Sequence, residues 1–495
     1  MRNLIFDMNT RYQTLDNFGA SACWWTDVAY EHASPEIMEK AAELLFHKKK
    51  GAGLSCVRMN IGGGSTEYDK EFIGSVATRS GCFQMKPGTE FDWSQHAGQQ
   101  WLVRRAKEMG CERFIAFVNS PPAWMTVNGH CRADSDYQGT SNLRPEMAGA
   151  FAEFLTEVMR HFEEIGYPFD YISPINEPAV PWNTAKQEGC RYENKDMVPV
   201  VLALRKALDE KGVKAGILVP ECNTLLHLLD EDLLDGILTR FYPERAVIND
   251  GEKTEKFGYR FGGKYNEVIK DFFVREDVRA AVSPIIAAHS YGTDTPGKLK
   301  PVRECLNENR ARYPGYDFWM TEFCVLGEYG PKRDFTMAAG EYVAKTIHAD
   351  LTIANASAWQ WWLGITAGDY KDGLVYLDVD RETLEVTGVH DSKILWAMGH
   401  YARFLRPGSV RVGLTGGDAE DGILASGWLN QDGVPVVVLM NTTDTAEQVA
   451  LYNAPAMAFR VWKTDDNVSM AAAPAIRAEK LFELPAHTFM TIQGC

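Results

Sequence analysis

The chain contains no apolar stretch of the length that a membrane-spanning helix needs. Apolar runs such as residues 434–440 are far shorter than the ~20 residues that cross a bilayer. Basic residues are also in deficit, since 51 lysines and arginines stand against 67 aspartates and glutamates, for a net charge of −16. A protein that holds a phosphate backbone or an anionic membrane surface needs the opposite sign. We therefore expect neither nucleic acid nor a membrane as a partner.

Motifs for metals and cofactors are missing as well. The ten cysteines form no CxxC pair, and the eleven histidines have no HExxH or HxH spacing. These spacings predict neither a disulfide framework nor a dedicated metal site. There is no P-loop, and the one glycine cluster, residues 62–64, lacks the G-x-G-x-x-G spacing of dinucleotide-binding folds. We expect a protein that uses no metal and no organic cofactor.

The first ten residues do not resemble a secretory signal. Asp7 and Asn9 interrupt their apolar residues, so there is no apolar core of the kind that a signal peptide has. If Met1 is the natural start, a cytoplasmic location is expected. A secreted form whose signal has been trimmed is the alternative.

Between residues 50 and 360, short apolar runs alternate with longer segments of helical period, which is typical of βα units. One helix is predicted between a cap at Ser34 and a stop at Gly51, and others over residues 98–110, 145–166 and 198–211. Strands are predicted at 18–21, 54–61, 113–118, 171–175, 214–219, 285–288, 318–320 and 357–361. Eight such strands predict an α/β fold, a (β/α)8 TIM barrel. An open doubly wound sheet is the alternative.

The pattern changes after about residue 395. Short strand-like segments at 410–413, 423–429, 435–440, 448–451, 459–463 and 488–492 are separated by polar turns, as in a small antiparallel β domain. The first fifteen residues are strand-like too. We therefore divide the chain into residues 1–15, which join a β-sandwich, residues 16–394, which form the barrel, and residues 395–495, the C-terminal β-sandwich.

Two glutamates stand where a barrel carries its chemistry, at the C-terminal ends of strands. Glu177 follows the fourth predicted strand and Glu322 follows the seventh. A carboxylate at such a place is costly unless something pairs with it or uses it. Two of them across a barrel mouth suit acid and nucleophile chemistry on a glycosidic bond. Salt bridges are the alternative explanation for such carboxylates.

Aromatic residues follow the ends of successive predicted strands. Flat rings suit the apolar faces of sugars, so their placement fits a sugar-binding cleft. Core packing is the alternative for any one of them, and we assign Trp24 and Trp359 to the core. The aromatic residues at strand ends are Trp24, Trp25, Trp124, Trp182, Tyr291, Trp359, Trp361 and Trp362.

Seven segments of the chain together resemble glycoside hydrolase family 30, in family order and across nearly the whole length. They are residues 17–21, 53–64, 119–125, 173–178, 289–291, 321–322 and 399–408. The resemblance implies a barrel whose β-sandwich is built from the N-terminal strand and the last hundred residues. It also implies a retaining β-glycosidase that acts on an oligosaccharide.

The resemblance further implies roles for single residues. Glu177 is similar to the family's general acid and base, and Glu322 to its nucleophile. Their carboxyl groups should then lie about 5–5.5 Å apart, against about 6.5–9.5 Å in inverting enzymes. Asn176 is similar to the residue that binds the sugar 2-hydroxyl, and Tyr291 to the one that orients the nucleophile. The remaining expected substrate contacts are Asn119, Trp124, Trp25, Trp182, His289 and one of Trp361 and Trp362, between which spacing does not decide.

The chain looks most like the branch of the family that acts on β-1,6-linked galactose. Specificity of the β-glucosidase, β-fucosidase or β-xylosidase type is the alternative, and the missing signal favours imported oligosaccharides over intact polymer. Two other functions remain open on this scaffold, a transglycosylase and a catalytically silent carbohydrate-binding protein. The sequence does not predict an oligomeric state.

Overall fold

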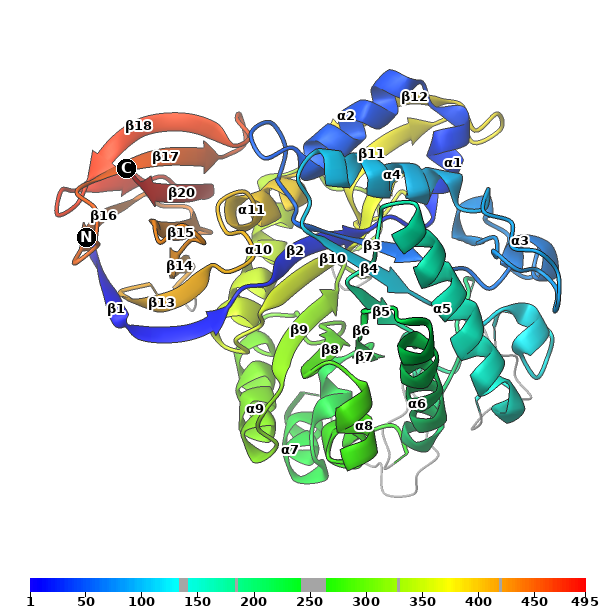
Figure 1. The fold of residues 1–495 in the computed structure, drawn as a ribbon. Helices are drawn as coiled ribbons and strands as arrows, with labels where there is room; N and C mark the ends of the chain where they lie inside the picture. Colours follow the sequence, from blue (N-terminus) through cyan, green and yellow to red (C-terminus); the bar gives the residue numbers. More distant parts are fainter. Residues whose placement is uncertain (133–140, 183–185, 242–263, 327–329, 418–420) are drawn as a thin grey trace.

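The computed structural model describes residues 1–495 except 133–140, 183–185, 242–263, 327–329 and 418–420. A closed parallel sheet surrounded by helices forms one part of the molecule, and a second sheet lies beside it (Figure 1). Both chain termini lie in the second sheet. None of the described helices is long and apolar enough to cross a membrane.

The parallel sheet is a barrel of eight strands. β6 pairs with β5 and β7 pairs with β8, so β6 and β7 act as one split strand that closes the sheet. The predicted (β/α)8 barrel is therefore confirmed, and the open doubly wound alternative is wrong because the sheet closes. The strands are β2 (Asn17–Ser21), β3 (Cys56–Asn60), β4 (Arg113–Phe117), β5 (Tyr171–Ser173), β6 (Gly216–Ile217), β7 (Val219–Cys222), β8 (Ile285–His289), β9 (Asp317–Glu322) and β10 (Ala358–Thr366).

Helices pack around the barrel through apolar faces that the sequence predicts. Ser34 Oγ accepts a hydrogen bond from the Ile37 amide at the start of α2, and Pro35 occupies the first turn. The long helix α5 buries Phe151 and Leu155 on one side. The helices are α1 (Trp25–His32), α2 (Pro35–Phe46), α3 (Ser65–Tyr68), α4 (Ala97–Glu108), α5 (Ala148–Glu164), α6 (Asn194–Lys211), α7 (Glu231–Phe241), α8 (Glu276–Ala281), α9 (Leu299–Arg312), α10 (Met337–Thr352) and α11 (Lys393–Ala402).

The second sheet joins both ends of the chain. β1 pairs antiparallel with β13 and parallel with β16, so the expected antiparallel sheet contains one parallel pair. Leu4 and Phe6 of β1 enter a core separate from that of the barrel. The strands are β1 (Arg2–Thr14), β13 (Val410–Thr415), β14 (Ile423–Leu429), β15 (Pro435–Asn441), β16 (Glu447–Tyr452), β17 (Ala458–Thr464), β18 (Ala471–Arg477), β19 (Phe482–Leu484) and β20 (Thr488–Gly494).

Four strands were not predicted from the sequence. β18 contains Pro474 and four alanines, which weaken the strand pattern, but it lies at the edge of its sheet, where proline is tolerated. β19 is only three residues long and lies at the opposite edge. The other two, β11 (Gly373–Val379) and β12 (Val386–Asp391), form a hairpin that extends the barrel sheet from β10.

A buried histidine links the barrel to the second sheet. His400 of α11 lies with Nδ1 2.8 Å from Thr491 Oγ1 of β20 and with Nε2 2.9 Å from Thr464 Oγ1 of β17. Burial, with a smaller contribution from the Arg403 charge, lowers the pKa of His400 to about 3. The folded protein therefore holds this imidazole neutral across the physiological pH range.

This arrangement predicts a pH-dependent stability. An unfolded histidine has a pKa of about 6.5, so the contribution of His400 is complete above that pH and is lost as the pH falls toward 3, at about 1.4 kcal/mol per pH unit. We expect His400→Gln to lower Tm at pH 7.5 and to make Tm fall less steeply between pH 6.5 and 4.5. The exposed His32→Gln serves as the control. Equal slopes for wild type and His400→Gln in thermal denaturation would contradict this account.

Candidate active site

Two glutamates face each other at the C-terminal end of the barrel. Glu322 is the last residue of β9, and Glu177 follows β5 by four residues. One carboxylate oxygen of each lies within 4.8 Å of the other. Glu177 adopts a positive φ of 45°, a region that side chains rarely occupy outside functional sites. Its amide donates to the Glu221 carbonyl at 2.8 Å, which fixes this conformation.

His289, the last residue of β8, lies between the two glutamates and is fully buried. Its Nδ1 is 3.0 Å from Glu177 Oε1 and 3.7 Å from Glu322 Oε1. Its Nε2 is 3.2 Å from Glu221 Oε2. Burial by itself would lower the pKa of His289, but the three carboxylates around it raise that pKa to about 9. The imidazole is therefore a cation at neutral pH.

Glu322 is held by two further groups. Arg58 of β3 places Nη1 3.1 Å from Glu322 Oε2, and the Tyr291 hydroxyl donates to Oε1 at 3.0 Å. Burial raises the pKa of Glu322, while the charges of His289 and Arg58 oppose that rise. The side chain of Glu322 is 5% exposed and that of Glu177 13%, so Glu177 is the more open of the two.

Glu221 was not predicted as a site residue, although, like the other two glutamates, it follows a predicted apolar strand. It lies directly after the predicted strand 214–219, within β7. Ser173 Oγ donates to its Oε1 at 2.6 Å, and the Thr321 hydroxyl donates to its Oε2. Burial would raise the pKa of Glu221, but the nearby cations Arg58 and His289 lower it to about 2. Glu221 is therefore a buried carboxylate anion.

Arg58 was also not predicted as a site residue. A charged residue inside an apolar strand is the pattern that could have marked it. Its side chain is fully buried, with Nη1 bonded to the Thr321 carbonyl at 2.8 Å and Nη2 3.6 Å from Glu221 Oε1. The guanidinium also covers the ring of Phe117 at 4.3 Å from the centroid. One arginine thus connects strands on opposite sides of the barrel.

The two predicted asparagines meet beside the glutamates. Asn176 Nδ2 donates to Asn119 Oδ1 at 3.2 Å, and both side chains are buried. Within the described part of the chain, Asn176 Oδ1 accepts no hydrogen bond. A buried polar atom without a partner is costly, so this oxygen is available for a hydroxyl group of a ligand.

Of the three predicted tryptophans outside β10, Trp182 contacts a reacting glutamate, whereas the contacts of Trp124 and Trp25 are with other residues. The Trp182 indole donates to the Glu177 carbonyl at 3.3 Å, and its ring packs on Gly189, where any Cβ would approach to 2.1 Å. Trp124 is half-buried and donates to the Gln84 carbonyl at 2.8 Å. Trp25 is buried at the start of α1, with the Arg381 guanidinium 4.9 Å from its ring.

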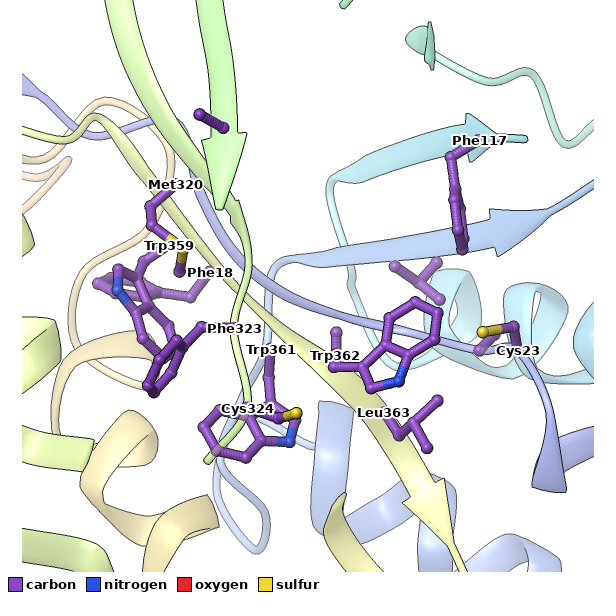
Figure 2. Packing of buried hydrophobic residues seen from close by; sticks show 14 of the residues in the cluster. Phe18, Cys23, Phe117, Met320, Phe323, Cys324, Trp359, Trp361, Trp362 and Leu363 are labelled. Carbon is purple, nitrogen blue, oxygen red and sulfur yellow. The ribbon is translucent and has the colours of Figure 1, made fainter. Parts of the chain in front are cut away.

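The structure separates Trp361 from Trp362. Trp361 is fully buried in the core, where its indole donates to the Asp372 carbonyl at 2.7 Å and its ring meets that of Trp359. Trp362 leaves β10 on another side, toward Phe117, whose ring it meets at 6.2 Å (Figure 2). Phe117 in turn lies under the Arg58 guanidinium, so these two side chains link Trp362 to the glutamate cluster.

The two tryptophans that we assigned to the core, Trp359 and Trp24, differ in how deeply they are buried. Trp359 is fully buried in the core, as predicted. Trp24, which we also assigned to the core, is only half-buried and meets the Trp362 ring edge-on at 5.1 Å. Trp24 therefore supports Trp362 from the side of the barrel mouth.

Glu177, His289 and Glu322 also offer three potential metal-ligand atoms within 4.8 Å of one another, the one such group among the described residues. The site already contains two positive charges, those of Arg58 and of the protonated His289. A metal cation would be repelled by both. The residues present therefore suit a proton and a neutral ligand better than a metal ion.

Comparisons with known proteins agree across the chain. The sequence profile described as O-Glycosyl hydrolase family 30 matches residues 2–242 and 251–376, and that of the glycosyl hydrolase family 30 beta sandwich domain matches residues 408–492. An endo-beta-1,6-galactanase of Hypocrea rufa is 25% identical over 248 residues, 45% of this chain and 49% of that protein. An exo-beta-1,6-galactobiohydrolase of Bifidobacterium longum is 26% identical over 119 residues, 23% of this chain and 8% of that protein. The chain thus matches half or less of the length of these relatives.

Solved structures are similar over the full length. A conserved exported protein from Bacteroides fragilis is 27% identical with a TM-score of 0.85, and the match covers 99% of both chains. The catalytic domain of the GH30 xylanase C from Talaromyces cellulolyticus is 20% identical with a TM-score of 0.71, again over 99% of both chains, and shows a shared fold. Because the profile of the barrel covers well over half of the chain, the protein belongs to O-glycosyl hydrolase family 30.

Proposed function

We propose that this protein is a retaining β-glycoside hydrolase, with Glu322 as the nucleophile and Glu177 as the general acid and base. The observation that carries the proposal is the distance between their carboxylates, whose nearest oxygens lie within 4.8 Å. Retaining enzymes hold this pair about 5–5.5 Å apart, and inverting enzymes leave about 6.5–9.5 Å for a water molecule. The short separation supports direct attack by one of the carboxylates.

The surroundings of the two glutamates support this division of roles. Arg58 and the Tyr291 hydroxyl both donate to Glu322, which favours its anion and aims its oxygen for attack. Glu177 is the more exposed of the pair, so it can reach a leaving group and later a water molecule. Asn176 Oδ1, which has no described partner, is free to accept a hydrogen bond from a sugar hydroxyl.

The reaction then takes two balanced steps. In the first, Glu322 attacks the anomeric carbon while Glu177 gives its proton to the glycosidic oxygen, so the C–O bond breaks and a glycosyl ester forms. In the second, Glu177 takes a proton from water, whose oxygen attacks the same carbon and releases Glu322. Two inversions give net retention. An acceptor sugar in place of that water would make the same site a transglycosylase.

For the substrate we propose a β-1,6-linked galacto-oligosaccharide. The two sequence relatives named above, an endo- and an exo-acting protein, are both named for β-1,6-galactan. Among the structural relatives, one is named as an endo-beta1,6-glucanase and several as xylanases, so glucosidase, xylosidase or fucosidase specificity is the alternative. A catalytically silent sugar-binding protein would not need a carboxylate pair together with two buried cations.

The proposal is tested by assaying the wild type on a panel of aryl β-glycosides and of β-1,6-, β-1,4- and β-1,3-linked oligosaccharides. We expect cleavage of β-1,6-galactobiose and its longer homologues, with the β-anomer as the first product by NMR. A first product with the α configuration would overturn the retaining mechanism. Binding of these sugars without cleavage would identify a binding protein instead.

Substitution of the carboxylates should separate their roles. We expect Glu177→Gln to lower kcat by about 10²–10⁴-fold on substrates with poor leaving groups, and less on activated aryl glycosides. Glu322→Gln should abolish turnover on both classes. Glu188→Gln is the matched control, because Glu188 is also fully buried but bonds to the Gly63 and Ser65 amides instead. Turnover by Glu322→Gln at the wild-type rate would refute the assignment.

Trp361 and Trp362 provide a second matched pair. We expect Trp362→Phe to lower kcat/KM about tenfold, or about 1.4 kcal/mol, through the loss of contact area beside the sugar. Trp361→Phe should instead lower Tm, because it leaves a cavity in the core, with kcat/KM within about threefold of wild type. The opposite pattern in steady-state kinetics and thermal denaturation would place Trp361 in the sugar site.

A further inference from the structure

Glu221 is a buried charge that the two-glutamate mechanism does not use. Its side chain is completely buried, and it contacts a cation on each side, with Oε2 3.2 Å from His289 Nε2 and Oε1 3.6 Å from Arg58 Nη2. Its backbone carbonyl accepts the hydrogen bond from the Glu177 amide. Glu221 therefore touches both cations that contact the reacting carboxylates, and the backbone of one of the two glutamates.

The two cations divide between the two reacting glutamates. His289 donates from Nδ1 toward Glu177, while Arg58 donates from Nη1 to Glu322. Nε2 of that imidazole faces Glu221, so the same ring joins Glu221 to Glu177. A single side chain therefore lies between Glu221 and each reacting glutamate. His289 connects it to Glu177, and Arg58 connects it to Glu322.

The count of charges explains why a third carboxylate is useful. Arg58 and protonated His289 bring two positive charges, and Glu221 and ionised Glu322 bring two negative charges. Glu221 balances one of the two cations, so Arg58 and His289 do not depend on the reacting glutamates alone for their counter-charge. Without the charge of Glu221, the excess positive charge would bind Glu322, which contacts both cations, more tightly.

We propose that Glu221 is a positioning residue that keeps Arg58 and His289 aimed at the reacting glutamates. This rests on the proposed function. Four other strands bring groups to Glu221, namely both cations and the hydroxyls of Ser173 and Thr321, and its own strand adds the neighbouring thiol of Cys222. Because these groups interact, removal of the Glu221 charge should change the pH dependence of the whole cluster and not that of one residue.

The test is the pH profile of kcat and kcat/KM for Glu221→Gln on a β-glycoside that the wild type cleaves. Loss of a nearby negative charge lowers the pKa values of its neighbours. We expect both limbs of the profile to move toward acid by about one pH unit, with kcat at pH 7 at least tenfold lower and KM little changed. Glu221→Asp, which keeps the charge, should restore the wild-type optimum with a lower kcat.

Ser173→Ala provides the control, because it removes one hydrogen bond to Glu221 and no charge. It should leave the pH optimum in place. A second measurement needs no variant of Glu221: NMR titration of wild-type histidines, with His289 assigned from the spectrum of His289→Gln, should find His289 protonated at pH 7. A folded Glu221→Gln protein with an unshifted profile, or a neutral His289 at pH 7, would overturn the proposal.

These outcomes are distinct from a failure of the proposed function. If the wild type cleaves with retention and Glu322→Gln does not, the hydrolase stands whatever Glu221→Gln shows. If the wild type cleaves nothing on the panel, the proposed function fails, and the positioning role fails with it because there is no reaction to position.

Discussion

The site depends on two buried cations. Arg58 and His289 lie among three carboxylates that are almost removed from water, where an unpaired charge would be severely destabilising. Arg58 contacts two of the carboxylates and His289 contacts all three, so no charge in the set lacks a partner. Removing one member leaves another uncompensated, which is why we expect substitutions here to alter titration as well as rate.

The barrel makes this cluster possible because it brings the C-terminal ends of its strands to one place. Arg58 comes from the second strand of the barrel, Glu221 from the fifth, His289 from the sixth and Glu322 from the seventh. The split strand of β6 and β7 closes the sheet and carries Glu221 at the closure. Glu177 and Glu221 both adopt positive φ, 45° and 54°, and the hydrogen bond between their backbones holds the two together.

The second sheet supports the barrel from the side away from the chemistry. β1 is inserted between strands from the other end of the chain, so the first residues are needed to complete a sheet that the last residues begin. His400 joins α11 to this sheet through two threonine hydroxyls. The two parts are therefore coupled by buried polar contacts as well as by apolar packing.

Much of the site was predictable from the sequence. Glu177 and Glu322 follow apolar strands directly, and the strand order places them across a barrel mouth. The same signal marks Glu221, but a carboxylate after a strand does not reveal what surrounds it. Arg58 was not predicted because an apolar strand with one charged residue still predicts only a strand. Nothing local shows that two carboxylates from other strands contact that charge.

The sequence by itself determined the eight strands, four of the helices and the glutamates at two strand ends, because these follow from local patterns of apolar residues and caps. Only the tertiary structure separated Trp361, whose ring meets that of Trp359, from Trp362, whose ring meets that of Phe117. Adjacent residues of a strand point to different sides, and a register shift after Trp361 hides the alternation. The tertiary structure alone decided the charge state of His289 as well. That state is set by Glu322 and by two carboxylates 112 and 68 residues away in the chain, Glu177 and Glu221, and a Coulomb interaction depends on distance in space.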